Sequence, residues 1–216
     1  RSVGMGSLEA NTTASNNTAV GFAALTANTT GTQNTAVGKD AGKAITTNSG
    51  CTMISATAGQ ANTAANNTAL GSGALYANTT GTQNTALGGS LYGSTQGALG
   101  TNTTGDHNTA VGSRSLLLNT TGSQNTSVGD RSLSANTTAD NNTAVGFKAL
   151  EANTTGTRNT SVGAFSLDVN TTGNDLCALG HNALGSNTTG SSNTAMGKDA
   201  LEENTTASSD TAFGFS

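Results

Sequence analysis

The sequence predicts an all-β fold, a parallel β-solenoid or β-roll of about 13 coils built on a 17-residue repeat. The repeated unit reads Asn-Thr-Ala-Val-Gly-x-x-Ala-Leu-x-Ala-Asn-Thr-Thr-Gly-x-x, and a fixed short period indicates one supersecondary unit stacked on itself. Its Asn, Thr and Gly residues are poor helix formers, and no apolar stripe of helical period is present. Turn-forming residues at repeat positions 5 and 15 leave room for two short strands in each coil.

The composition excludes several functional classes. Charged residues make up 9% of the 216 residues and the net charge is -4, so no basic stripe is present and we expect no binding of nucleic acid. No run of 18 apolar residues occurs, so we expect no membrane insertion. Cys51 and Cys177 are about seven coils apart, or roughly 34 Å at the strand spacing, which is too far for a disulfide within one straight chain.

Two columns of large apolar residues are predicted to form the core. If Asn17 and Asn34 are taken as position 1, position 4 is always a large apolar residue and position 9 is Leu in most coils. Each coil then buries about two large side chains, which is too little to hold a coil alone, so neighbouring coils must stack. The predicted core residues are Val20, Leu25, Val37, Leu75, Val111, Leu116, Val128, Leu133, Val145, Leu150, Val162, Leu167 and Leu201.

The Asn-Thr-Thr triplet at positions 12–14 is nearly invariant between coils, and identical Asn side chains stacked at the strand spacing can form an amide ladder. The residues assigned to this ladder are Asn28, Asn78, Asn119, Asn136, Asn153, Asn170, Asn187 and Asn204. Asn at position 1 is expected to make a second ladder.

Positions 3 and 8 carry Ala or Ser in nearly every coil and never a charge. Because neighbouring residues of a strand face opposite sides, these positions should face away from positions 4 and 9. We therefore expect a second copy of the chain to cover the small residues, in a homotrimer or another tight bundle. The alternative is that both sets point into a narrow coil. The predicted interface residues are Ala19, Ala24, Ala36, Ala144, Ala149, Ala195 and Ala200.

The chain is predicted to be one repeat domain, 1–216, with two departures from the period. Coils 43–66 are irregular, and 89–95 is a seven-residue insertion at a turn. The chain begins and ends inside a repeat, which is the pattern expected of a longer fibre or of copies that abut end to end in a filament.

The repeat resembles those of phage tail-fibre-like and bacterial surface fibre proteins. Its Thr-Ala-Val-Gly segment is also distantly similar to the Ser-Val-Ala-Ile-Gly repeats of trimeric autotransporter adhesin heads, although the coils of those heads are shorter. The resemblance implies a left-handed parallel β-roll, assembly as a homotrimer, and a place outside the cell or on a virion surface. It carries no catalytic residues over to this chain.

These patterns favour a structural fibre or filament shaft, and the alternative is a binding solenoid, either an adhesin for surface glycans or, less favoured, an ice-binding protein. No catalytic set is recognisable, so we expect neither enzymatic activity nor a metal or other cofactor. The two histidines, His107 and His181, are expected at turns. Candidate glycosylation sites, which the amide ladder explains without glycans, are the sequons at Asn11, Asn28, Asn78, Asn102, Asn119, Asn136, Asn153, Asn170, Asn187 and Asn204.

Overall fold

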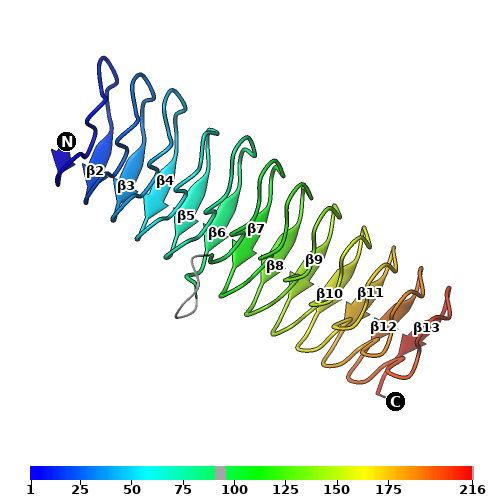
Figure 1. Ribbon diagram of the computed structural model, residues 1–216. Coiled ribbons are helices and arrows are strands. Elements are labelled where there is room, and N and C mark those ends of the chain that lie inside the picture. Colours follow the sequence, from blue (N-terminus) through cyan, green and yellow to red (C-terminus); the bar gives the residue numbers. More distant parts are fainter. Residues whose placement is uncertain (91–95, 216) are drawn as a thin grey trace.

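The protein is a straight row of stacked coils with its termini at opposite ends (Figure 1). The computed structural model describes residues 1–90 and 96–215. Within these ranges there is no helix, and thirteen strands form one parallel sheet in sequence order. This confirms the predicted parallel β-solenoid. The strands are β1 (Ser2–Val3), β2 (Thr18–Val20), β3 (Thr35–Val37), β4 (Thr52–Ile54), β5 (Thr68–Leu70), β6 (Thr85–Leu87), β7 (Thr109–Val111), β8 (Thr126–Val128), β9 (Thr143–Val145), β10 (Thr160–Val162), β11 (Cys177–Leu179), β12 (Thr194–Met196) and β13 (Thr211–Phe213).

Each coil contributes one strand, made of repeat positions 2–4, and not the two that the sequence pattern predicted. The strands pair in strict register, so that Thr143, Ala144 and Val145 of β9 lie beside the matching residues of β10. The second predicted strand fails to form because the backbone φ is positive at positions 7 and 9, as in Lys148 (58°) and Leu150 (55°). This left-handed backbone forms turns where an extended strand was expected.

The interior of each coil is narrow and is filled by positions 3, 8 and 9. In the ninth coil these are Ala144, Ala149 and Leu150, and none of the three has any exposed surface. An extended backbone would point positions 8 and 9 in opposite directions. The positive φ of Leu150 breaks this alternation, and both side chains reach the interior.

The assignment of the position 4 residues to the core was wrong. In the strand, position 3 faces the interior and position 4 therefore faces out. Of the predicted core, the leucines are fully buried except Leu201, which is half-buried in the last full coil. The valines are half-buried or exposed, as follows: Val20, Val37, Val111, Val128, Val145 and Val162.

The assignment of the small residues to an interface between copies was wrong for the same reason. Their own coil already buries them, with at most 1% of their surface exposed: Ala19, Ala24, Ala36, Ala144, Ala149, Ala195 and Ala200. Small side chains are needed because the coil is narrow, as the alternative interpretation proposed. Where Ser replaces Ala, the hydroxyl finds an internal acceptor, and Ser115 donates to the carbonyl of Ser127 at 2.9 Å.

Two buried asparagines close each coil through one shared carbonyl. In the ninth coil the Nδ2 groups of Asn142 (position 1) and Asn153 (position 12) both donate to the carbonyl of Gly156, at 2.8 and 2.9 Å. Gly156 belongs to the third side of the coil, so this carbonyl ties the three sides together. Position 15 is Gly or Ala in nearly every coil, and where it is Ala139 the same carbonyl still accepts from both asparagines, Asn125 and Asn136.

The same asparagines link each coil to the next. At position 12 the amides form the predicted ladder, in which Asn153 Nδ2 donates to Asn136 Oδ1 at 3.1 Å. At position 1 the ladder uses the backbone, and the N–H of Asn159 donates to Asn142 Oδ1 at 2.9 Å. All the residues assigned to the position 12 ladder belong to it except Asn204, which leaves Asn187 Oδ1 without a partner. The ladder also includes Asn62 and Asn102.

The irregular region 43–66 is a set of matched substitutions. Gly42 and Gly59 stand at position 9, where Leu would fill the core, and the larger Ile45 and Met53 replace Asn and Ala nearby. A Cβ on Gly59 would collide with the Met53 sulfur, so Met53 occupies the space of the absent leucine. The substitution of Ile45 for Asn interrupts the position 12 ladder. As a result, Asn28 Oδ1 is buried without a hydrogen-bond partner.

The longest coil keeps the register of the solenoid. Asn102 donates to Asn78 across 24 residues at 2.8 Å, so this coil holds seven residues more than the 17-residue unit. Most of the insertion predicted at 89–95 lies outside the described residues. The ladder and the strand pairing on either side continue without a shift.

We expect the ladder to contribute strongly to stability. Asn136→Ala removes the donor to Asn119 Oδ1 and the acceptor of Asn153 Nδ2, and it leaves the Ala139 carbonyl with Asn125 as its one asparagine donor. The cost should be about 2–4 kcal/mol, measured as the free energy of unfolding in urea by circular dichroism. Thr138→Ala, two residues away and exposed, is the control and should change stability by less than about 0.5 kcal/mol. Equal effects of the two substitutions would contradict a structural role for the ladder.

The matched pair Met53 and Gly59 should be energetically coupled. Gly59→Leu alone should destabilise the chain by about 2 kcal/mol or more, because its side chain collides with Met53. Met53→Ala alone should cost a similar amount through the cavity that it leaves. The double variant restores the Ala and Leu of the regular repeat, so its cost should fall well below the sum of the two. Additive free energies of unfolding would contradict this account.

Candidate functional surfaces

The outer face of the sheet extends along the whole row of strands. We call the outward side chains of positions 2 and 4 in β1–β13 the strand face. Position 2 is Thr in β2–β13 except at Cys177, β1 begins at position 3 with Ser2, and position 4 is always a large apolar residue. Within each interior strand, the residues on either side of the buried position 3 are exposed or half-buried. The strand face therefore carries a continuous apolar row beside a row of hydroxyl groups.

No charged residue occurs on the strand face in any of the thirteen strands. Its apolar side chains remain open to solvent, with 38% of Val20, 45% of Leu70 and 37% of Val162 exposed. Isolated exposed apolar residues are ordinary, but a contiguous apolar strip along a whole molecule marks an interaction surface. The uncharged surface that the chain leaves open is therefore the strand face, and not positions 3 and 8.

Most of the candidate glycosylation sites are buried and cannot accept a glycan. Eight of the ten asparagines have no exposed surface: Asn28, Asn78, Asn102, Asn119, Asn136, Asn153, Asn170 and Asn187. Their amide nitrogens are hydrogen-bonded inside the coil, which is the alternative that the ladder pattern had offered. Only Asn11 and Asn204, in the outermost coils, are partly exposed.

A row of three aromatic rings crosses three successive coils after the position 5 turn. The centroids of Phe147 and Phe165 are 5.3 Å apart, and those of Phe165 and His181 are 5.8 Å apart, each pair meeting edge to face. We call these residues the ring row. Phe147 is 42% exposed, and the side chain of His181 is 53% exposed. The row was not predicted from the sequence, because Phe147 and His181 are at position 6 whereas Phe165 is at position 7. Only aromatic residues that share position 6 were compared with one another.

Charged side chains surround the ring row. Lys148 Nζ lies 5.9 Å from the Phe147 centroid and 3.1 Å from a carboxylate oxygen of Glu151. Asp168 occupies the same repeat position as Glu151 on the next coil, and it forms no ion pair among the described residues. Burial raises the pKa of the Asp168 carboxyl, and the nearby Glu151 carboxylate raises it further. At the other end, His181 Nδ1 lies 3.8 Å from an oxygen of Asp199.

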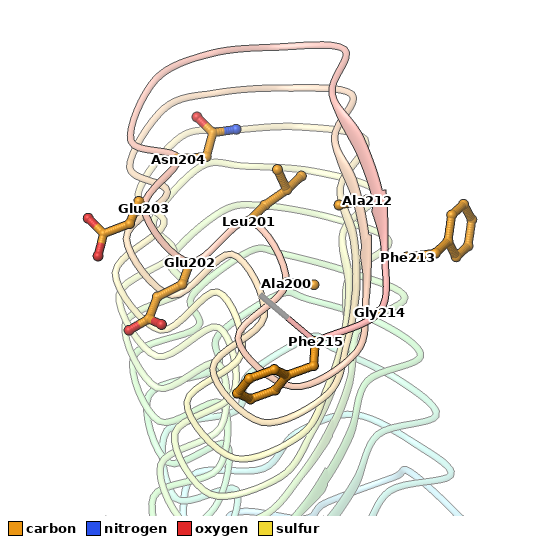
Figure 2. A pocket seen from close by; sticks show the side chains of 9 residues that line it. All are labelled: Ala200, Leu201, Glu202, Glu203, Asn204, Ala212, Phe213, Gly214 and Phe215. Carbon is orange, nitrogen blue, oxygen red and sulfur yellow. The ribbon is translucent and has the colours of Figure 1, made fainter.

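The C-terminal end of the solenoid is a hollow of about 300 Å³ where the last turn stops (Figure 2). Ala200, Leu201 and Ala212 form its apolar floor, and Phe215 closes one side. In the earlier coils, the side chains at these repeat positions are covered by the next coil. The hollow is therefore the open end of the core, and its shape follows from the repeat.

The described ranges offer no other recognisable chemistry. They contain no cluster of three or more His, Cys, Asp and Glu side chains suited to a metal ion. They also contain no helix with the length and apolar character needed to cross a bilayer. No family model, curated protein or solved structure matched the chain. Function is therefore inferred from the geometry of the solenoid itself.

Cys51 should be inert in the native protein. It replaces the Asn of position 1, is 1% exposed, and its thiol donates to the Ala64 carbonyl at 3.2 Å. Burial raises the pKa of this thiol, so little reactive thiolate is present near neutral pH. In a Cys177→Ser variant, labelling of Cys51 by N-ethylmaleimide at pH 7.5 should be at least about a hundredfold slower than in urea. Similar rates in the native and unfolded states would show that this coil opens readily.

Proposed function

We propose that the protein is a shaft segment of an extracellular or virion fibre, assembled from parallel copies that meet through the strand face. The supporting observation is the unbroken, uncharged strand face, whose apolar row the chain leaves open to solvent. The stacked coils suit a stiff rod, because backbone hydrogen bonds connect every coil to the next and the asparagine ladders add to most of these connections.

The size of the strand face fits an interface between copies. Thirteen strands at about 4.8 Å give a length of about 58 Å, and two outward rows give a width of about 10 Å. A pair of copies would bury about 1,200 Å² in total, at the lower end of the range for specific interfaces. In a homotrimer, which the resemblance to adhesin heads implies, each copy would contact both others around an axis parallel to the shaft.

The side chains at position 4 favour a protein partner over ice. The strands carry a regular outward Thr-x-apolar pattern, and a regular array of threonines can bind ice. The prediction against ice binding considered only the adjacent Thr pair in the turn. However, position 4 varies from Val111 through Leu70 and Met196 to Phe213. Side chains of such different sizes fit a packed interface, whereas a crystal lattice requires a flat surface of uniform height.

Charge placed on the strand face should break the assembly and leave the coil intact. Val128 and Val162 point outward from β8 and β10, so Lys at both sites costs the single chain little but would bury charge in an interface. Light scattering should give a multiple of 21.1 kDa for the native protein and 21.1 kDa for the Val128→Lys/Val162→Lys variant. Thr138→Lys, an exposed site away from this face, should keep the native mass.

Cys177 supplies a second readout, because it lies on the strand face in β11. Its labelling by N-ethylmaleimide should be slow in the assembly and fast in the double lysine variant. A native protein that is monomeric at micromolar concentration would contradict the proposal. Thermal hysteresis by such a monomer would instead support ice binding by the same face.

A further inference from the structure

We propose that the ring row Phe147, Phe165 and His181 is a binding site for an uncharged polysaccharide lying along the shaft. The inference goes beyond the shaft function, because it concerns a different surface. It gives the glycan-binding alternative a location.

The rings provide the apolar part of such a site. Pyranose sugars present patches of C–H groups that pack against aromatic rings, which supply rigid area at low conformational cost. Phe147 and His181 are exposed, and Phe165 between them is half-buried and contacts both rings. The contacts fix the rings relative to one another, so the row offers a preorganised surface.

The groups around the rings suit hydroxyl ligands. Glu151 and Asp168 provide carboxylate acceptors, and Lys148 provides a donor beside Phe147. Binding sites for small polar ligands combine apolar surface with a few such placed polar groups. Asp168 is notable because no ion pair uses its carboxylate in the described ranges.

The charges around the row disfavour an acidic ligand. Five carboxylates stand at the same repeat positions of the row and its neighbouring coils, against three cations: Asp130, Glu151, Asp168, Asp199 and Glu202 against Arg131, Lys148 and Lys198. The whole chain carries a net charge of -4, which further disfavours acidic polysaccharides.

The direction of the row selects a linear ligand. One ring lies on each of three successive coils, and the coils repeat at about 4.8 Å along the axis. This step is comparable to the length of one sugar unit in an extended chain. A polysaccharide parallel to the shaft would therefore contact the rings with successive units.

The site remains accessible if copies assemble through the strand face. Figure 2 shows the relevant directions at the C-terminal end, where Phe213 at position 4 points away from the coil on one side. Phe215 at position 6 and Glu202 at position 10 both point away from the side of Phe213, and both line the terminal hollow. Phe147 and His181 share position 6, and Glu151 and Asp168 share position 10, so they should face away from the assembly axis.

The test substitutes residues that other coils of this chain carry at the same repeat positions. Phe147→Ala introduces the residue found at the same position of the next coil, Ala164. Phe165→Asn introduces the residue at the position of Asn182, whose φ of 57° nearly equals the 58° of Phe165. The matched control is Phe22→Ala, which removes a ring that is 49% exposed at position 6 of a distant coil. Circular dichroism and light scattering verify that fold and assembly are unchanged.

Binding is measured by affinity electrophoresis of the full chain in dextran, hydroxyethyl cellulose, mannan and galactomannan, with hyaluronan as the acidic comparison. We expect retardation by at least one neutral polymer, an apparent Kd at least about tenfold weaker in the double variant, and less than a twofold change in Phe22→Ala. No retardation by any of the four neutral polymers, retention of binding in the double variant, or retardation by hyaluronan alone would overturn the proposal. The mass of the assembly is measured independently, so failure here leaves the shaft proposal standing.

Discussion

The hydrogen bonds of the two buried asparagines are the interactions on which the rest of the structure depends. Backbone hydrogen bonds join each coil to its neighbours both within the three-residue strand and outside it, but they run from coil to coil and do not tie the sides of one coil to each other. Asn142 and Asn153 supply what is missing, because both bind the carbonyl of Gly156 and both continue to the neighbouring coils. Buried amides are costly unless they are satisfied, so the coil is stable only in this closed form. The near-invariance of Asn at position 12, and its frequency at position 1, follow from that requirement.

The irregular coils show how far the remaining positions can change. The core tolerates Gly in place of Leu when Met53 or Ile45 supplies the volume from another side, in keeping with cores that conserve volume more than identity. The ladder is less adaptable. Where Ile45 replaces its Asn, the acceptor on Asn28 stays unpaired, although Cys51 partly substitutes at position 1 by donating its thiol proton to Ala64.

The solenoid could be predicted from the sequence because the 17-residue period is regular. The prediction of which side of the strand faces the core was wrong. The reasoning assumed that strands alternate everywhere and that the largest apolar residues lie inside. Leu150 violates the first assumption through its positive φ, and Val145 violates the second because a narrow coil admits only Ala144 at that strand. Left-handed backbone at a leucine has no signature in a single sequence. The ring row was hidden for a related reason, since Phe165 and His181 lie 16 residues apart and not 17.

The ladders also give the rod an electrical direction. In both, the bonds between coils run from a donor to a side-chain oxygen of the preceding coil, so the amide dipoles of successive coils point the same way along the axis. Aligned peptide dipoles give an α-helix a positive and a negative end, and chains of hydrogen-bonded amides polarise one another. This β-structure should therefore carry a helix-like dipole inside its core. Copies packed side by side and parallel would experience mutual repulsion of these dipoles, which the apolar contacts of the strand face would have to exceed.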